Sequence, residues 1–342
     1  MKIGVVLIIA TAMMLYLVGV AKLPNSYNNG FTRKSIGNLI SSQKIYEVSP
    51  DYIKICGVTD HSLFLSSSLP NSLLILDKDL KNSSVVPISL NAGLDSLVPF
   101  KIFVDSPRVY IHVNNLAAMF LGNLGDTNFH RKNMSLNTFT RSVQISPNLV
   151  LMRGFFSNSF DQEFALINTN TNKILKKETL LKDHDDAGFV SDGSLQFDSE
   201  TNKVVYVQFY QNNIFVLDTN LEVLTQSHTI DTIEHNFIEI KKIKSGDQIK
   251  ILPSAPRQLV NGEFAVANGK IFVLSQVKSD DMDIHRFRST TVVDVYKLST
   301  CKYMGSFFFE KKHNEKVLSI SAVGNHIFLL YKGSVYSYSL KA

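Results

Sequence analysis

The sequence is poor in the residues that stabilise small or metal-dependent proteins. Only two of the 342 residues are cysteines, Cys56 and Cys301, and neither has a partner at zinc-finger or CxxC spacing. A disulfide framework and a structural metal are therefore not expected. Tryptophan is absent, so core aromatics must come from 23 phenylalanines and 12 tyrosines. Nine prolines, 17 glycines and 44% hydrophobic residues are typical of a folded chain rather than a low-complexity one.

The sequence also lacks a strong charge bias and the common catalytic motifs. Lysine and arginine outnumber aspartate and glutamate by only 35 to 30 and are spread along the chain, so a nucleic-acid partner is not expected. There is no Gly-x-Ser-x-Gly elbow, P-loop, dinucleotide-binding Gly-x-Gly-x-x-Gly or His-Glu-x-x-His. We therefore expect no cofactor, name no catalytic residue, and consider an enzyme the less favoured class.

One long uncharged run stands at the N-terminus. Residues 3–20 follow Lys2 and contain no charged side chain. As a helix this run would extend about 27 Å, close to the roughly 30 Å of bilayer hydrocarbon. Small residues near its end also fit a secretory signal cleaved after Ala21. Residues 1–21 are thus predicted to be either a membrane anchor or a signal peptide, and residues 22–38, rich in Asn, Ser, Gly and Lys, a tether. The rest of the chain is expected on the outer side of the cytoplasmic membrane, in the periplasm, anchored or released.

From residue 39 onward, the sequence predicts β-strands arranged as a repeat. Short runs with apolar residues at every second position alternate with polar turns. A strand-turn-strand phrase recurs six times, and its strand centres are Ile75, Met119, Leu166, Val216, Asp294 and Tyr336. The centres lie 42 to 50 residues apart except for one gap of 78. A period of about 40 to 50 residues with four strands each is typical of a β-propeller blade.

The sequence therefore predicts an all-β domain, residues 39–342, folded as a six-bladed propeller of four-stranded blades. The long gap contains a charged hairpin-like segment, residues 237–252, which we interpret as an insertion; a seventh blade is the alternative. The last repeat is one strand short, whereas residues 39–48 stand alone before the first. We expect that N-terminal strand to pair beside residues 334–340 and close the ring.

These phrases, such as Val-Leu-Asp-Thr-Asn-Leu-Glu-Val-Leu at 216–224, resemble those of exported bacterial six-bladed propellers of the TolB-like and NHL-like kind, including many from Bacteroidetes. The resemblance covers about 300 residues. It implies the fold and commonly a binding role, and it transfers no catalytic residues.

Two clusters of titratable residues are the candidate site. The first comprises residues 182–186 followed by Asp192, and the second residues 280–286 followed by Arg288. In the blade scheme, the first connects blades three and four, and the second joins the middle strands of blade five; both connections emerge on the face around the channel mouth. The candidate ligand-binding residues are His184, Asp185, Asp186, Asp281, Asp283, His285 and Arg286. Whether they hold a divalent cation is left open, and solvated loops are the alternative reading.

Two functions remain from these patterns. The first is a non-catalytic, membrane-tethered or secreted propeller that binds a protein, peptide or glycan through its loop face. The second is a propeller hydrolase or lyase with an acid-base or metal site at the channel mouth, for which His184, Asp185, Asp186 and His285 are the candidates.

Overall fold

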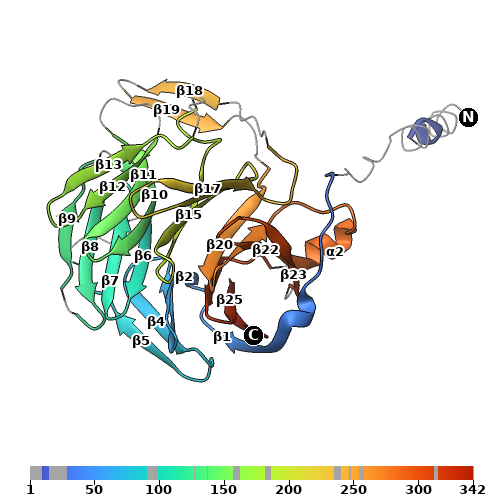
Figure 1. The fold of residues 1–342 in the computed structure, drawn as a ribbon, viewed down its shortest axis with the longest axis horizontal. Helices are drawn as coiled ribbons and strands as arrows, with labels where there is room; N and C mark the ends of the chain where they lie inside the picture. Colours follow the sequence, from blue (N-terminus) through green and yellow to red (C-terminus); the bar gives the residue numbers. More distant parts are fainter. Residues whose placement is uncertain are drawn as a thin grey trace, which may run out of the picture.

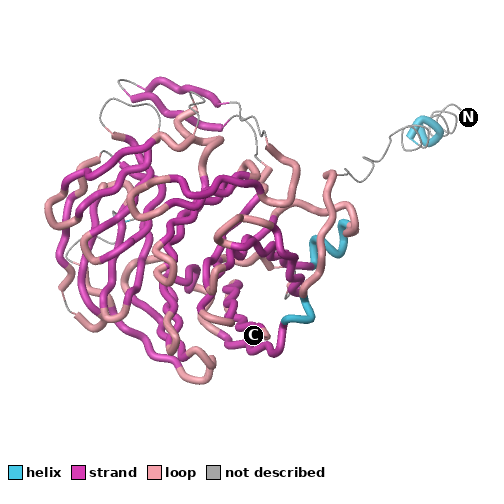
Figure 2. The backbone as a smooth tube through the Cα atoms, in the orientation of Figure 1, coloured by secondary structure: helices cyan, strands magenta, loops and turns pink. Residues whose placement is uncertain are grey.

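Six antiparallel four-stranded sheets form the body of the molecule (Figure 1). A computed structural model of the chain describes residues 10–14, 29–90, 97, 99–126, 128–136, 138–156, 162–181, 186–234, 240–245, 248–253, 258–311 and 315–341. Figure 2 shows that almost all regular structure in these ranges is strand, with only short helical pieces. The predicted all-β, six-bladed propeller is confirmed.

The blades follow the chain in order. The first contains β2 (Tyr52–Val58), β3 (Ser62–Ser67), β4 (Ser72–Asp77) and β5 (Ser83–Pro87). The second contains β6 (Phe100–Asp105), β7 (Arg108–Val113), β8 (Ala118–Asn123) and β9 (His130–Asn133). The third contains β10 (Thr138–Ser146), β11 (Leu149–Phe155), β12 (Glu163–Asn168) and β13 (Lys173–Glu178). The fourth contains β14 (Gly193–Asp198), β15 (Lys203–Gln208), β16 (Asn213–Leu217) and β17 (Val223–His228).

The fifth blade contains β20 (Asn261–Ala267), β21 (Lys270–Ser275), β22 (Thr290–Lys297) and β23 (Tyr303–Glu310), with α2 (Ile284–Ser289) between its middle strands. The sixth combines β24 (Ser319–Val323), β25 (His326–Tyr331) and β26 (Ser334–Leu340) with β1 (Ile40–Glu47) from the other end of the domain. Each predicted strand centre lies in the third strand of a blade. The long gap holds β18 (Ile240–Ser245) and β19 (Gln248–Pro253), a separate two-stranded sheet, so the insertion is confirmed and the seventh blade is wrong.

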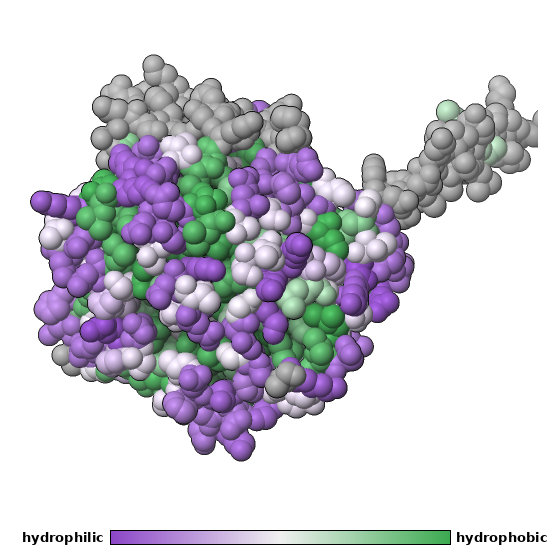
Figure 3. Space-filling view, in the orientation of Figure 1, coloured by the Kyte–Doolittle hydropathy of each residue, from purple (hydrophilic) through white to green (hydrophobic). Residues whose placement is uncertain are grey.

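The core is divided among the interfaces between neighbouring blades. Six hydrophobic clusters each join residues of two adjacent blades, including the last and the first. The middle strands are therefore buried on both faces, as in β15, where five consecutive residues are buried. Outer strands such as β13 alternate between exposed and half-buried residues, because one face meets solvent. Polar residues consequently cover most of the surface seen in Figure 3, with apolar residues between them.

The ring closes as predicted. β1 pairs antiparallel with β26 from Ile40 opposite Leu340 to Glu47 opposite Ser334. The outer edge of the sixth blade is thus completed by a strand that precedes the first blade in the sequence (Figure 1).

The chain immediately before β1 is packed on blade five. Asp280 accepts hydrogen bonds from the backbone N–H groups of Asn29 and Gly30, at 2.6 and 2.9 Å. The Arg33 side chain is fully buried and forms a bidentate ion pair with Asp294. Its Nε donates to Oδ1 at 2.9 Å and its Nη2 donates to Oδ2 at 3.0 Å. We call residues 29–36 the strap. It is followed by the short helix η1 (Gly37–Leu39) and occupies much of the predicted tether.

Most of the predicted membrane or signal segment, residues 3–20, lies outside the described residues; residues 10–14 form a helical turn. Within the part of the chain that the structure describes, we find no helix with the length and hydrophobicity needed to cross a bilayer.

Candidate functional site at the channel mouth

The two acidic connections lie around one hollow. The first joins β13 to β14 and the second joins β21 to β22, as the blade scheme required. A hollow of about 720 Å³ is lined by Asp192 from the first connection and by Phe287 and Arg288 from the second. Residues 182–185, which include the candidates His184 and Asp185, lie outside the described residues. The remaining candidates can be placed individually.

Asp186 folds its own loop. Its side chain is 3% exposed and accepts hydrogen bonds from the N–H groups of Gly188 at 2.9 Å and Val190 at 2.6 Å. In this conformation the carboxylate satisfies buried backbone donors. In the structure, the role of this candidate residue is to stabilise the backbone of its own loop.

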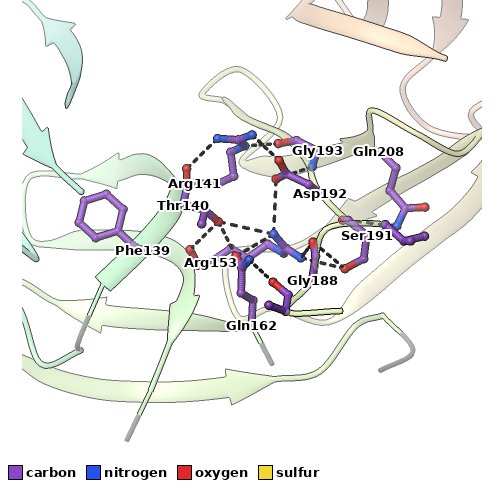
Figure 4. A network of polar contacts seen from close by, with 12 residues as sticks. Phe139, Thr140, Arg141, Arg153, Gln162, Gly188, Ser191, Asp192, Gly193 and Gln208 are labelled. Atoms are coloured by element: carbon purple, nitrogen blue, oxygen red, sulfur yellow. Dashed lines mark hydrogen bonds and ion pairs between the residues drawn. The ribbon is translucent and has the colours of Figure 1, made fainter. Parts of the chain in front are cut away.

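The loop shaped by Asp186 rests on a buried arginine (Figure 4). Arg153, from β11, donates to the Gly188 carbonyl at 2.9 Å and to the Ser191 hydroxyl at 2.8 Å. It also donates to Gln162 at 2.8 Å and lies 3.4 Å from Asp192. A buried guanidinium needs such acceptors, because desolvation of an unpaired charge costs several kcal/mol. Arg153 thus holds the loop against blade three.

Arg141 belongs to the same network, because it also contacts Asp192, and it lines the channel mouth. It projects from β10 and contacts Asp192 at 2.6 Å and the Gly193 carbonyl at 2.5 Å (Figure 4). Its guanidinium carbon lies 5.2 Å from the centre of the Phe209 ring, a cation–π arrangement. Arg141, Asp192 and Phe209 together form one wall of the mouth.

The carboxylates of the second cluster also have protein partners. Asp281 accepts from the Arg33 N–H at 3.4 Å; burial alone would raise its pKa, but its hydrogen bonds hold the pKa below the ordinary value. Asp283 caps α2 by accepting from the N–H groups of His285 and Arg286, both at 2.9 Å, which lowers its pKa. The side chains of His285 and Arg286 are exposed, and the Arg286 guanidinium lies 5.8 Å from the Phe308 ring centre.

A third group of charged residues lies inside the channel, and the sequence patterns did not single it out. The innermost strands β2, β6, β10 and β20 contribute Lys54, Lys101, Arg141 and Glu263 to its wall. Lys54 forms an ion pair with Glu263. The Lys101 ammonium donates to the Ser142 carbonyl at 3.2 Å and lies 4.6 Å from the centre of the Phe103 ring. The signal that could have identified them is a charged residue within the first four positions of the first strand, which occurs in blades one, two, three and five.

The surroundings of Lys101 favour its neutral form. Desolvation lowers its pKa to about 7, and the positive charges of Lys54 and Arg141 act in the same direction, whereas Glu263 opposes them. Burial would raise the pKa of Glu263, but the neighbouring cations, Lys54 first, hold it below the ordinary value. The channel therefore contains a lysine whose charge changes near neutral pH.

Three hollows meet along the channel. Lys54, Lys101 and Glu263 line both a hollow of about 280 Å³ and one of about 410 Å³. Arg141, Phe209 and Glu263 line both the latter and the hollow of about 720 Å³ at the mouth. Among the described residues, no group of three His, Cys, Asp or Glu side chains is arranged to hold a metal ion.

Comparison with known proteins extends only to the fold. No protein-family model matches this chain, and no curated protein matches its sequence. A member of the DUF4221 family from Bacteroides vulgatus has a TM-score of 0.54 at 10% identity, over 88% of this chain and 97% of that one. A streptogramin B lyase structure has a TM-score of 0.52 at 9% identity, over 90% and 100%. Virginiamycin B lyase from Staphylococcus aureus reaches 0.50 at 10% identity, over 87% and 100%. The expected resemblance to Bacteroidetes propellers is confirmed at the level of the fold.

Proposed function

We propose that this chain is a non-catalytic binding protein that takes a protein, peptide or glycan at its channel mouth, outside the cytoplasm. The observation that carries the proposal is the set of adjoining hollows at the mouth. Their walls combine aromatic rings, such as Phe209, with fixed charged groups, such as Arg141 and Asp192. A concave site with a few held polar groups is the usual form of a ligand-binding surface, and propellers commonly use this end of the channel.

An acid-base enzyme at the same mouth is the second candidate, and one observation favours it. Lys101 has a pKa of about 7, which is suited to accepting or donating a proton at neutral pH. Catalysis would also require a group of complementary role within reach of the same bond. Product formation from a bound ligand, lost in Lys101→Met, would favour this candidate over binding alone.

The position of the strap supports a tether that starts on the mouth face. Asn29 lines a hollow of about 970 Å³ with Asp280 and Phe287, and Phe287 also lines the hollow at the mouth. Eight residues, 21–28, can span at most about 28 Å. If residues 3–20 are retained as an anchor, the mouth is held near the membrane surface. Export is tested by fusing residues 1–40 to a reporter that is active only outside the cytoplasm, and an inactive reporter contradicts it.

Binding is tested by screening the full chain, purified in detergent, against arrays of peptides and glycans. We expect a ligand whose binding weakens in Arg288→Glu, at the rim of the mouth, and persists in Lys203→Glu. Lys203 is a matched control, because it lies at the opposite end of the propeller. It stands opposite Asp198 in the register of β14 and β15, whereas Gly193, which contacts Arg141, is at the other end of β14. A ligand sensitive only to Lys203→Glu would overturn the choice of face.

A further inference from the structure

The channel contains positive charge that its own carboxylates do not balance. The hollow of about 410 Å³ is lined by three cationic side chains, Lys54, Lys101 and Arg141, and by one carboxylate, Glu263. Lys54 is paired with Glu263, and Arg141 with Asp192. Among the described residues, no carboxylate lies within ion-pair distance of Lys101, whose protein partners are a backbone carbonyl and an aromatic ring. Lys101 is therefore the one lining cation of this hollow that has no carboxylate partner among the described residues.

A second observation points to a ligand in the same space. Ser319, on β24, is 1% exposed, and among the described residues its hydroxyl has no hydrogen-bond partner. It lines the hollow of about 280 Å³ together with Lys54, Lys101 and Glu263. A buried, unpaired hydroxyl is costly, and Ser319 lines the same hollow as Lys101, so a polar ligand in this hollow would give the hydroxyl a partner.

The remaining wall is rich in neutral polar groups. Side chains with hydroxyl or amide groups line the hollow of about 410 Å³, namely Ser66, Ser67, Asn114, Thr140 and Ser194. Phe209 lines both this hollow and the hollow at the mouth, and the Arg141 guanidinium carbon lies 5.2 Å from its ring centre. Ser67, Asn114 and Thr140 already donate to protein acceptors, but their side-chain oxygens can still accept hydrogen bonds from a ligand that carries several hydroxyls.

We propose that the channel binds a uronic acid, either free or as the end of an acidic glycan, with its carboxylate at the Lys54 and Lys101 ammonium groups. A ligand carboxylate would give Lys101 the anionic partner that the described residues do not supply. The ligand hydroxyls contact the polar wall of the hollow of about 410 Å³ and Ser319 in the adjoining hollow, and the sugar ring lies toward Phe209. This inference rests on the proposed function, since it names the ligand class of the same mouth.

The pH dependence follows from the groups around Lys101. Lys54, Arg141 and Glu263 face it from β2, β10 and β20, and His112 on β7 is neutral at physiological pH because burial lowers its pKa to about 3. A bound carboxylate stabilises the protonated amine, so binding takes up a proton above pH 7. Affinity should fall as pH rises through 7, by up to about tenfold per pH unit.

The test is calorimetric titration of the full chain, in detergent at low salt, with D-glucuronate and D-galacturonate at pH 6 and pH 8.5. We expect binding at pH 6 that is at least about tenfold weaker at pH 8.5, with proton uptake seen as a buffer-dependent heat. Lys101→Met should weaken binding at pH 6 at least about tenfold and remove the pH dependence, and Lys203→Met, at the opposite end, should change neither. The pH arm uses the unaltered chain, so it decides the question even if Lys101→Met does not fold.

D-glucose, inorganic phosphate and the dipeptide Glu-Glu are the competing probes. Tighter binding of phosphate or Glu-Glu than of either uronate overturns the inference, as does uronate binding that is equal at both pH values. If neither uronate binds, but a ligand from the array screen is still lost in Arg288→Glu, the uronate assignment fails and the proposed function stands. If the array screen also finds no ligand that is lost in Arg288→Glu, both the uronate assignment and the proposed function are wrong.

Discussion

Asp186 turns its side chain toward the backbone of its own loop, although its sequence context suggested a ligand-binding loop. The two N–H groups that it accepts from, on Gly188 and Val190, lie in the loop that Arg153 holds against blade three. Dense carboxylates in a propeller connection can therefore serve the loop itself, because each connection must satisfy its own backbone donors.

Replacing Asp186 with alanine should destabilise the domain without touching any exposed surface. Two buried N–H donors lose their acceptor, which costs about 1 to 3 kcal/mol for each. Asp281→Ala is the matched control, since Asp281 is exposed and its hydrogen bond to the Arg33 N–H is long, at 3.4 Å. Urea unfolding measures both. An Asp186→Ala protein as stable as the parent would show that the loop is held by other contacts.

His112 should make the domain sensitive to mild acid. It is fully buried, with ring nitrogens 2.9 Å from the Ser142 hydroxyl and 3.0 Å from the Gln144 side-chain oxygen. Burial lowers its pKa from 6.5 to about 3, so below pH 6.5 the unfolded chain binds a proton that the folded chain does not. The stability contribution is complete above pH 6.5 and decreases by up to about 1.4 kcal/mol per unit as pH falls toward 3. Thermal unfolding between pH 7 and 5 should show a steeper loss for the parent than for His112→Gln; parallel curves would contradict this.

At the scale of elements, a buried ion pair helps to fix the strap on blade five. Arg33 also donates to the Val277 carbonyl at 3.0 Å and to the Ser275 hydroxyl at 2.6 Å, while Ser306 donates to Asp294 at 2.6 Å. The Arg33 contacts join the strap to β22 and to the end of β21, and Ser306 on β23 supports the same Asp294 carboxylate. The chain that leads to the N-terminus therefore has a fixed departure point on the domain.

Arg33→Met should loosen the strap by leaving Asp294 buried without its cation. Removal of one partner from a buried pair costs about 3 to 5 kcal/mol, whereas replacing both with apolar residues is often nearly neutral. We therefore expect Arg33→Met to lower stability strongly and Arg33→Met/Asp294→Leu to recover much of it. A double-mutant cycle by urea unfolding gives the coupling. Additive effects would mean that the pair does not hold the strap.

The closing strand acts mainly through its backbone. Five consecutive residues of β1 are exposed, so apolar burial contributes less than its hydrogen-bonded register with β26. Deleting residues 40–47 exposes the edge of β26, with its buried residues Tyr336 and Tyr338, which is a template for pairing with another chain. We expect lower thermal stability and self-association, measured by scattering and gel filtration. A deletion variant that stays monomeric with unchanged melting would refute the closure role.

At the scale of the whole molecule, the fold was predictable because each blade repeats one local pattern. Third strands such as those around Ile75 and Val216 are bounded by polar turns, and the period follows from their spacing alone. The channel site was not predictable in the same way. Lys54, Lys101 and Glu263 come from three blades, and whether a lysine there has a neutralising carboxylate depends on the closed ring. The acidic clusters were conspicuous in the sequence, but Asp186 and Asp280 are used by nearby backbone groups.

The position at which the strap leaves the domain also determines which end of the propeller would face the bilayer in an anchored chain. Asn29 leaves the domain beside Asp280, next to the hollow lined by Phe287 and Arg288. In a chain that retains residues 1–21 and is reconstituted into vesicles, a fluorophore at the mouth should therefore be nearer to the lipid than one at the opposite end.

Arg288→Cys and Lys203→Cys provide these two labelling sites. The native thiols of Cys56 and Cys301 are 7% and 1% exposed, and burial raises the pKa of each, so the introduced cysteines should react selectively. We expect energy transfer to an acceptor lipid to be more efficient from position 288 than from position 203. Proteolysis at a site inserted between residues 21 and 29 should abolish transfer from both positions, because the domain then leaves the vesicle. Equal transfer from both labels, or stronger transfer from position 203, would mean that the mouth does not face the membrane.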